Sequence, residues 1–389
     1  MRTLIVLDNL YTGGVASSFY NYLQYASAHM DCSLLIFDED SVDMSRIPSN
    51  VQMIKPSKLL HILGKNRQNL KKESYFLLLY KAVLTVLGRI INGEFARKWL
   101  MCFVKIVKKF GTFDLAIAFS QDDGWKSISK GCTDFVLQKV DAKCKAVLIH
   151  CDYQNFGGYH PNQEKSYSLL DYIICVSESC KERFCACFPN LRDKTIACEN
   201  FTDVERIKKL AGEGITYPTG MTNFVTISRL SAEKGLDRTI RVFKKLLDEG
   251  MDRFTWTVVG GGLQYEALKK QIKECNLEDH IFLVGNKENP YPYLKNASAF
   301  ILPSFNEASP MVYGECAVLG IPIITTNTCS AVEMVEKRNW GIVVENSEEG
   351  IEKGLRAAMN GQIGTSEICS GINDNAEMQF CKFLHAVQN

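Results

Sequence analysis

Residues 303–326 read PSFNEASPMVYGECAVLGIPIITT, and this stretch determines the fold class. The apolar run directly before it, Ala299–Leu302, has the length and composition of a buried strand. Ser309 and Pro310 are typical of an N-cap and a first-turn proline, so we expect a helix to start there. A second apolar run, Ile321–Thr325, follows that helix. The order strand, loop, helix, strand is typical of a parallel sheet, and therefore of an α/β protein.

Two carboxylates lie in this stretch, beyond the end of the first predicted strand. Glu307 falls in the loop, and Glu315 falls in the second turn of the helix. The backbone N–H groups of Met311 and Val312, in the first turn, point towards the loop and form an anion site together with the helix dipole. A ligand that carries both phosphate and hydroxyl groups suits this combination.

The spacing E-x7-E from Glu307 to Glu315 is followed by G-x-P and by an E-x-V element at Glu333–Val335. This arrangement resembles the retaining glycosyltransferases of family 4. The resemblance covers most of the chain and is specific mainly in residues 224–345. It implies the GT-B fold, an α/β architecture in which two doubly wound, Rossmann-like domains face one another across a cleft.

The resemblance also implies roles for the residues of this stretch. Glu307 would hold hydroxyls of the donor sugar, and Glu315 would hold the ribose of the nucleotide. The remaining donor-binding positions around the helix start are Ser309, Pro310, Met311 and Val312. Ala308 departs from the glycine that is usual in the family. If that glycine serves a positive φ, alanine costs about 1–2 kcal/mol there, and the departure puts the sugar specificity in question.

Two cations follow the predicted strand Phe224–Ile227. Arg229 and Lys234 lie in the loop that leads to a helix starting near Leu236. A rigid guanidinium and a mobile ammonium at the carboxyl end of a strand can neutralise a departing diphosphate, which is the largest electrostatic demand of glycosyl transfer. The pattern R-x4-K alone is common in solvated loops. Its position before the E-x7-E matches the arginine and lysine pair of family 4, so we assign both residues to catalysis.

Further candidates belong to the N-terminal half. Gly13 and Gly14 follow the first apolar strand and precede a helix, where glycines let the backbone approach a phosphate or a sugar. A tight turn has the same composition. His150 directly follows the predicted strand Ala146–Ile149. Many such histidines are structural, but family 4 enzymes frequently carry one here, which implies that His150 contacts the donor sugar or positions the acceptor.

Two further sequence features concern the binding of a nucleobase and of a metal ion. Asn286 follows the predicted strand Ile281–Val284, and loops of this kind commonly bind nucleobases in doubly wound sheets. Asp38-Glu39-Asp40 is formally a D-x-D motif, the metal signature of the other large glycosyltransferase fold. Acidic triplets after strands are usually solvated loops, so we expect neither a metal ligand nor a cofactor.

Short apolar strands alternate with helix-length segments along the whole chain, and 389 residues suggest two domains. We expect an N-terminal acceptor domain over residues 1–215 and a donor domain over 220–372. A segment with glycines and a proline, Ala211–Thr222, is the expected hinge. The C-terminal segment 375–389 contains an amphipathic helix that, by resemblance, crosses back to the N-terminal domain. The alternative is a helix that covers the second sheet.

Charge is concentrated in one part of a chain whose net charge is only +1. Residues 55–110 hold 13 lysines and arginines against two acidic residues, Glu73 and Glu94. Their apolar and basic residues recur at helical spacing, which fits helices lying on an anionic membrane surface. Packing of the apolar stripe on the sheet fits equally well. We do not expect nucleic-acid binding, because the segment contains no known binding motif.

The sequence therefore predicts a metal-independent, retaining hexosyltransferase of cell-surface polysaccharide synthesis. Its donor would be a nucleotide diphosphate sugar, with UDP as the first choice, and its acceptor a saccharide or a lipid-linked saccharide. Fifteen cysteines without a secretion signal indicate reduced thiols in a cytoplasmic protein, with peripheral attachment to the inner face of the plasma membrane as an option. A nucleotide-sugar epimerase of the same fold and a non-catalytic subunit of a transferase complex are the alternatives.

Overall fold

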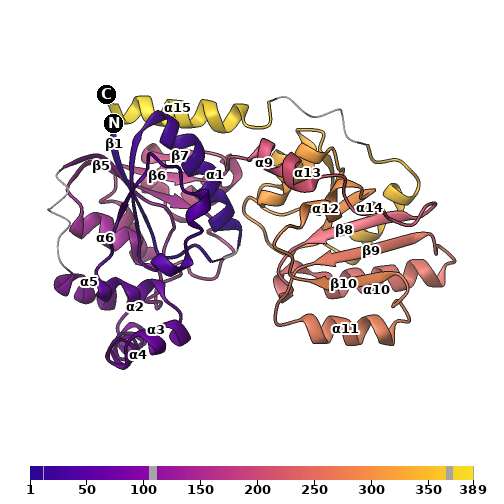
Figure 1. The fold of residues 1–389 in the computed structure, drawn as a ribbon, viewed down its shortest axis with the longest axis horizontal. Helices are drawn as coiled ribbons and strands as arrows, with labels where there is room; N and C mark the ends of the chain where they lie inside the picture. The colour runs from indigo at the N-terminus through magenta and orange to yellow at the C-terminus, as the bar shows by residue number, and fades with distance from the viewer. Residues whose placement is uncertain (12, 105–111, 365–370, 389) are drawn as a thin grey trace. The chain divides into compact units, whose positions relative to one another are not determined.

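The computed structural model describes residues 1–11, 13–104, 112–364 and 371–388. The chain divides into two compact units. Unit 1 comprises Met1–Phe201 and Asn375–Asn389, and unit 2 comprises Thr202–Asp374. Each unit contains one parallel sheet with helices packed around it (Figure 1). The predicted two-domain α/β architecture is confirmed.

The sheet of unit 1 has the strand order β3-β2-β1-β4-β5-β6-β7, and every neighbouring pair is parallel. Its strands are β1 (Arg2–Leu7), β2 (Asp31–Ile36), β3 (Gln52–Ile54), β4 (Phe113–Ala118), β5 (Ala142–Ile149), β6 (Tyr172–Cys175) and β7 (Thr195–Ala197). The order reverses between β1 and β4, which makes the sheet doubly wound.

The helices of unit 1 connect these strands and follow the predicted alternation. They are α1 (Gly14–His29), α2 (His61–Gly64), α3 (Arg67–Glu73), α4 (Tyr75–Ile90), α5 (Gly93–Phe103), α6 (Cys132–Lys139), α7 (Glu164–Tyr167), α8 (Glu178–Cys187) and the C-terminal α15 (Asp374–Gln388).

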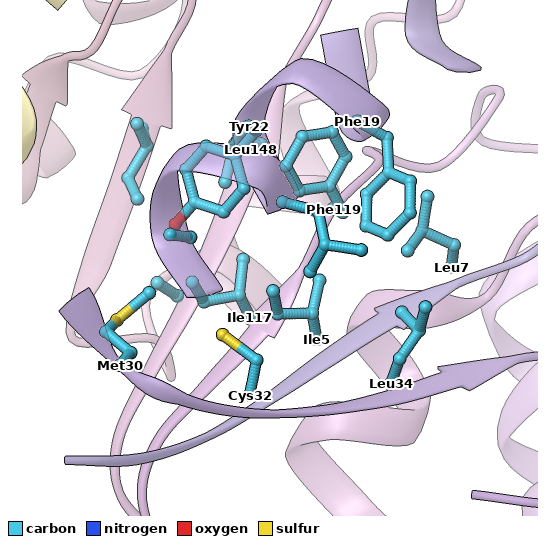
Figure 2. Packing of buried hydrophobic residues seen from close by; sticks show 14 of the residues in the cluster. Ile5, Leu7, Phe19, Tyr22, Met30, Cys32, Leu34, Ile117, Phe119 and Leu148 are labelled. Atoms are coloured by element: carbon cyan, nitrogen blue, oxygen red, sulfur yellow. The ribbon is translucent and has the colours of Figure 1, made fainter. Parts of the chain in front are cut away.

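The core of unit 1 forms where α1 packs on the sheet. Figure 2 shows Phe19 and Tyr22 of α1 lying among apolar side chains of the strands, including Ile5 and Ile117. Helix α15 joins the same core through Phe380, whose ring lies 5.6 Å from that of Tyr22. The last helix thus completes the core of unit 1.

Unit 2 has the strand order β10-β9-β8-β11-β12-β13, again all parallel. Its strands are β8 (Thr222–Ile227), β9 (Phe254–Val259), β10 (Ile281–Gly285), β11 (Ala299–Leu302), β12 (Ile323–Thr326) and β13 (Gly341–Val344). Its α-helices are α9 (Val204–Ala211), α10 (Leu236–Asp248), α11 (Tyr265–Glu274), α12 (Tyr291–Lys295), α13 (Met311–Leu319) and α14 (Glu348–Met359). Separate apolar clusters on the two faces, one with α10, α11 and α14 and one with α12 and α13, hold the layers together.

The division between the units falls before Thr202 rather than between residues 215 and 220. The segment expected to be a hinge is part of unit 2 and is tied to α12 and its C-terminal end. The Tyr217 hydroxyl donates to the carbonyl of Tyr293 at 2.6 Å, and the Asn296 amide donates to the carbonyl of Ile215 at 2.9 Å. Because these hydrogen bonds join positions that are distant in sequence, the composition of Ala211–Thr222 gives no indication of them.

Within the described ranges, no helix is long and apolar enough to cross a bilayer. Among the cysteines in those ranges, none is joined in a disulfide.

Candidate active site

The topology of unit 2 singles out one place on its sheet. The strand order reverses between β8 and β11, which are direct neighbours. In open α/β sheets, ligands bind beyond the carboxyl ends of the strands at this reversal. The loop after β8 carries Arg229 and Lys234, and the loop after β11 carries Glu307. The fold therefore brings the two cations and Glu307 to the same edge of the sheet. The sequence had assigned them to one site, although they belong to two separate motifs.

Lys234 and Glu307 are in direct contact. The Lys234 ammonium lies 2.6 Å from Glu307 Oε1, and the Ser304 hydroxyl donates to the same oxygen at 2.6 Å. The side chains of Lys234 and Glu307 are only 14% and 12% exposed. A further bond, from the backbone N–H of Phe305 to the carbonyl of Glu233 at 2.8 Å, joins the two loops. The ion pair is thus held in a largely covered position before any ligand arrives.

Arg229 is far more exposed to solvent than Lys234. Its side chain is 72% exposed, and its guanidinium lies 3.3 Å from Glu233, four residues later. Exposed pairs of this kind contribute little to stability, about 0–1 kcal/mol. Arg229 therefore reorients at little cost when an anion binds nearby.

Helix α13 begins one residue later than the sequence suggested. Its first residue is Met311 and its N-cap is Pro310, with no side-chain capping bond, so the prediction that Ser309 caps the helix is wrong. The Ser309 hydroxyl instead lies 3.2 Å from Sδ of Met334. Met311 and Val312 still form the first turn, whose N–H groups have no earlier helical carbonyl to bind. Ala308 is not among the non-glycine residues with positive φ, so the strain considered for alanine does not arise.

Glu315 occupies the second turn of α13, as predicted. The Tyr291 hydroxyl of α12 donates to its Oε1 at 3.3 Å. Burial raises the pKa of Glu315 to about 7, against the effect of that hydrogen bond. Its carboxyl group therefore has few partners within the protein for its charged form, and a ligand hydroxyl would supply one.

Asn286 directly follows β10 and lies against a glycine loop that the sequence analysis missed. Gly260, Gly261 and Gly262 follow β9, and a Cβ on Gly261 would lie 3.1 Å from the Asn286 amide nitrogen. A Cβ on Gly260 would lie only 1.8 Å from the carbonyl oxygen of Ser228. Three consecutive glycines after an apolar strand are a visible signal for a close backbone approach at a sheet edge.

Arg238 is a second residue that the sequence analysis missed. Its guanidinium carbon lies 3.9 Å from the centre of the Phe305 ring, and the group donates to the carbonyl of Pro303 at 2.7 Å and to Asn346 Oδ1 at 2.6 Å. Arg238 therefore anchors the loop that carries Glu307. Its partners lie far away in sequence, so no local pattern marks it.

The candidates of unit 1 follow its strands β1 and β5. Gly13 is the N-cap of α1 and Gly14 is its first residue. A Cβ on either would meet no atom of the described residues within 4 Å, so the start of α1 is open. His150 Nε2 lies 2.9 Å from the carbonyl oxygen of Phe119, which assigns its proton to Nε2 and leaves Nδ1 as an acceptor. Burial, with a smaller contribution from the nearby Lys130, lowers the pKa of His150 to about 4, so the ring is neutral near pH 7.

The D-x-D triplet is engaged by a cation of the chain. The Lys65 ammonium lies 2.5 Å from Asp40 Oδ2 and 3.8 Å from Asp38 Oδ1. The Tyr11 hydroxyl also donates to Asp38 at 2.5 Å. An ammonium group that lies against both carboxylates takes the place of a divalent cation, so the triplet does not fit a metal site.

The basic segment 55–110 is described only as far as residue 104, so its last part lies outside the described residues. The described part contains α2, α3, α4 and α5. Apolar side chains of α4 both pack into the unit and face the solvent. One face of α4 thus packs into unit 1, as one of the two alternatives predicted, and the other face is exposed to solvent.

Residues 216–377 match the family described as "Glycosyl transferases group 1". The matched region, which is less than half of the chain, is similar to group 1 glycosyltransferases. The predicted resemblance to family 4 glycosyltransferases is confirmed, and the match covers most of unit 2 with its β8 and β11 loops.

Curated relatives and solved structures agree with this family. The chain is 28% identical over 255 residues to the putative colanic acid biosynthesis glycosyltransferase WcaL of Escherichia coli, covering 62% of this chain and 58% of the relative. It is 26% identical over 166 residues to an uncharacterised glycosyltransferase of Methanocaldococcus jannaschii, covering 41% of each. These alignments span about half the length of the relatives. The crystal structure of Anabaena HepE in complex with UDP superimposes with a TM-score of 0.63 at 14% identity, covering 99% of this chain and 100% of that one, which confirms the GT-B fold.

Proposed function

We propose that this chain is a retaining glycosyltransferase that moves a sugar from a nucleotide diphosphate donor to a saccharide or a lipid-linked saccharide. The observation that carries the proposal is the covered Lys234–Glu307 pair at the strand reversal of unit 2. In this account the donor is a UDP-sugar and the product belongs to a cell-surface polysaccharide. The UDP bound to HepE and the colanic acid pathway named for WcaL support these two choices.

The leaving group is the first task of such an enzyme. When the bond between the anomeric carbon and the phosphate oxygen breaks, negative charge grows on the nucleoside diphosphate. Lys234 and Arg229 would neutralise that charge, and the first-turn N–H groups of Met311 and Val312 would donate hydrogen bonds to it. Lys234 is held in place, whereas Arg229 is free to follow the diphosphate. Two cations and a helix start supply this stabilisation without a metal ion.

The two glutamates would bind the sugars of the donor. Glu307 Oε1 already accepts from Lys234 and Ser304, so its carboxylate is oriented to accept hydroxyls of the transferred sugar with its other oxygen. Glu315 would accept the ribose hydroxyls, which gives its desolvated carboxylate the partners it lacks. Ser309 and Pro310 shape the entry to α13, and Asn286 beside the glycine loop would contact the base.

Gly13, Gly14 and His150 of unit 1 would bind the donor sugar or position the acceptor. The open start of α1 at Gly13 and Gly14 admits a ligand close to the backbone. His150 is neutral near pH 7 and would accept a hydrogen bond at Nδ1 rather than donate a proton. We place the protein in the cytoplasm, where nucleotide sugars are available, with lipid-linked acceptors at the membrane face.

A transfer assay tests the proposal. Purified protein is screened by thermal shift against nucleotide sugars, since a bound ligand stabilises the folded form by mass action. The stabilising donor is then assayed for transfer with saccharide and lipid-linked acceptors. Lys234→Ala and Glu307→Gln should each reduce turnover by about 100-fold or more, while Lys245→Ala, an exposed lysine of α10, should not. Activity should persist in EDTA.

Two results would overturn this assignment. Full turnover in Lys234→Ala would remove the leaving-group role from the ion pair. Loss of activity in EDTA with recovery on adding manganese would replace the cation pair by a metal-dependent mechanism.

A further inference from the structure

One face of α4 exposes an apolar stripe to solvent. Its large apolar side chains, each at least 51% exposed, are Tyr75, Phe76, Leu79, Val83, Val86 and Ile90. At 100° per residue these positions fall within an arc of about 100° on the helix. Leu77, Leu84 and Gly88 lie on the opposite side and are buried in unit 1. The helix is therefore apolar on two sides, and unit 1 covers only one of them.

The stripe continues onto α5 through a chain of aromatic rings. The ring centres of Phe76 and Tyr80 lie 6.4 Å apart, those of Tyr80 and Trp99 5.8 Å, and those of Trp99 and Phe103 5.7 Å. Phe95, Trp99 and Phe103 are spaced four residues apart on α5 and are all exposed. We call the exposed stripe of α4 with these three residues the α4–α5 face. Contiguous apolar surface of this kind is unusual on a soluble monomer and marks an interaction site.

The surroundings of the α4–α5 face are basic. Lys71 and Lys72 lie exposed at the end of α3, and Arg89 lies exposed on α4. The cation of Lys71 lies 5.8 Å from the ring of Tyr75. Figure 1 shows α3 and α4 together at the margin of unit 1.

The acidic residues of α3, α4 and α5 are only Glu73 and Glu94, and both are engaged within the protein. Lys65 lies 3.0 Å from Glu73, and His61 Nδ1 lies 2.7 Å from it. Glu94 pairs with Lys98 and accepts from the Ser166 hydroxyl at 2.7 Å. The helices α3, α4 and α5 together carry seven lysines and arginines against these two acidic residues, so the charge around the face is basic.

We propose that the α4–α5 face docks unit 1 on an anionic lipid bilayer, with the apolar stripe among the acyl chains and Lys71, Lys72 and Arg89 at the headgroups. Apolar, aromatic and basic side chains in this order match the depth profile of a membrane interface. A second copy of this chain is a poorer occupant. In a twofold dimer the face meets itself, so its basic residues would face like charges with no acidic complement.

This inference deepens the proposed function, because a membrane-docked enzyme reaches lipid-linked saccharides. It has an independent test, which measures binding to vesicles without any nucleotide sugar. A failure of docking would leave the transfer assay on soluble acceptors unaffected, and a failure of transfer would leave vesicle binding unaffected.

Vesicle flotation with the full-length protein tests the docking. Vesicles of phosphatidylcholine with about 30% phosphatidylglycerol should carry the protein upward, whereas vesicles of phosphatidylcholine alone should carry much less. Raising the salt to about 0.5 M should weaken the binding, because it screens the basic residues. The double variant Phe76→Ser/Leu79→Ser should lose at least ten-fold in bound protein, and Lys71→Gln/Lys72→Gln should lose several-fold. Both variants alter exposed side chains, so folding is expected to be retained and is checked by thermal unfolding.

Matched controls come from unit 2. Leu263→Ser removes the most exposed leucine there, and Lys269→Gln/Lys270→Gln removes an exposed lysine pair of α11. Neither should change flotation. The proposal is overturned if the wild type fails to float with anionic vesicles, or if Phe76→Ser/Leu79→Ser floats as the wild type does. It is also overturned if that variant only converts a dimer to a monomer in light scattering.

Discussion

At the scale of single residues, the charged groups of the site differ in how firmly the protein holds them. Lys234 and Glu307 are covered and in contact, whereas Arg229 is mostly exposed and its guanidinium lies against Glu233, four residues away. Glu315 is desolvated with one weak hydroxyl bond. Lys234 and Glu307 thus form a fixed ion pair, and Arg229 is a mobile cation. Glu315 is a carboxylate whose hydrogen bonds a ligand would complete.

The raised pKa of Glu315 makes a prediction about stability and pH. Between the ordinary value of 4.5 and about 7, the folded protein keeps a proton that the unfolded chain has lost. The stability contributed by the protonated group is therefore full below pH 4.5 and is lost as the pH rises through about 7. Glu315→Gln stays neutral at every pH. It should be more stable than the wild type by on the order of 3 kcal/mol near pH 8 and equal to it near pH 4.

Urea unfolding across this pH range, monitored by tryptophan fluorescence, measures the difference. The exposed Glu266→Gln is the control and should shift stability little at any pH. A constant difference between Glu315→Gln and the wild type from pH 4 to 8 would contradict the assigned pKa.

At the scale of elements, the loop between β11 and α13 is shaped from outside itself. Arg238 of α10 binds the carbonyl of Pro303, stacks on Phe305 and holds Asn346, whose amide in turn donates to the carbonyl of Phe305 at 3.0 Å. Glu307 follows two residues later. The position of the carboxylate thus depends on a buried cation that does not touch it.

Arg238→Met tests this arrangement. It keeps an apolar stem but leaves the carbonyl of Pro303 and the Asn346 side chain without their charged donor. The free energy of unfolding should fall by about 2–3 kcal/mol, and turnover should fall because Glu307 loses its fixed position. Arg241→Met, on the same helix but half exposed, should cost less than about 1 kcal/mol. Equal losses in both variants would show that Arg238 is an ordinary surface arginine.

The sequence could predict the elements whose causes lie in neighbouring residues, and it could not predict features that depend on residues distant in sequence. The strand β11, the loop with Glu307 and the helix with Glu315 follow from apolar runs, Pro310 and Gly320. Ser309 was misread, because its hydroxyl has a partner 25 residues away at Met334. Arg238 could not be found, because its partners Pro303 and Asn346 are 65 and 108 residues away.

At the scale of the whole molecule, each unit contains one helix that its place in the sequence suggests for the other unit. Helix α15 returns to unit 1, where Phe380 and Phe383 are buried. Helix α9 belongs to unit 2, although the sequence placed it in the first domain. The strand alternation predicted two doubly wound sheets, but the boundary depends on packing that composition does not reveal.

Phe380→Ala tests the role of α15 in unit 1. The side chain is fully buried against Tyr22 and Phe201, so its removal should destabilise unit 1 by about 3–5 kcal/mol. Met378→Ala, on the same helix and 47% exposed, should cost under about 1 kcal/mol. Hydrogen exchange should become faster in β1 and α1 and stay unchanged in unit 2. Unchanged exchange throughout would contradict the assignment of α15 to the core of unit 1.

The most direct measurement is a crystal structure of the chain with the nucleoside diphosphate that gives the largest thermal shift. We expect the diphosphate to lie within hydrogen-bond distance of Lys234 and of the N–H groups of Met311 and Val312, and the ribose to contact Glu315. A diphosphate bound elsewhere, for example through a metal ion on Asp38 and Asp40, would contradict this expectation.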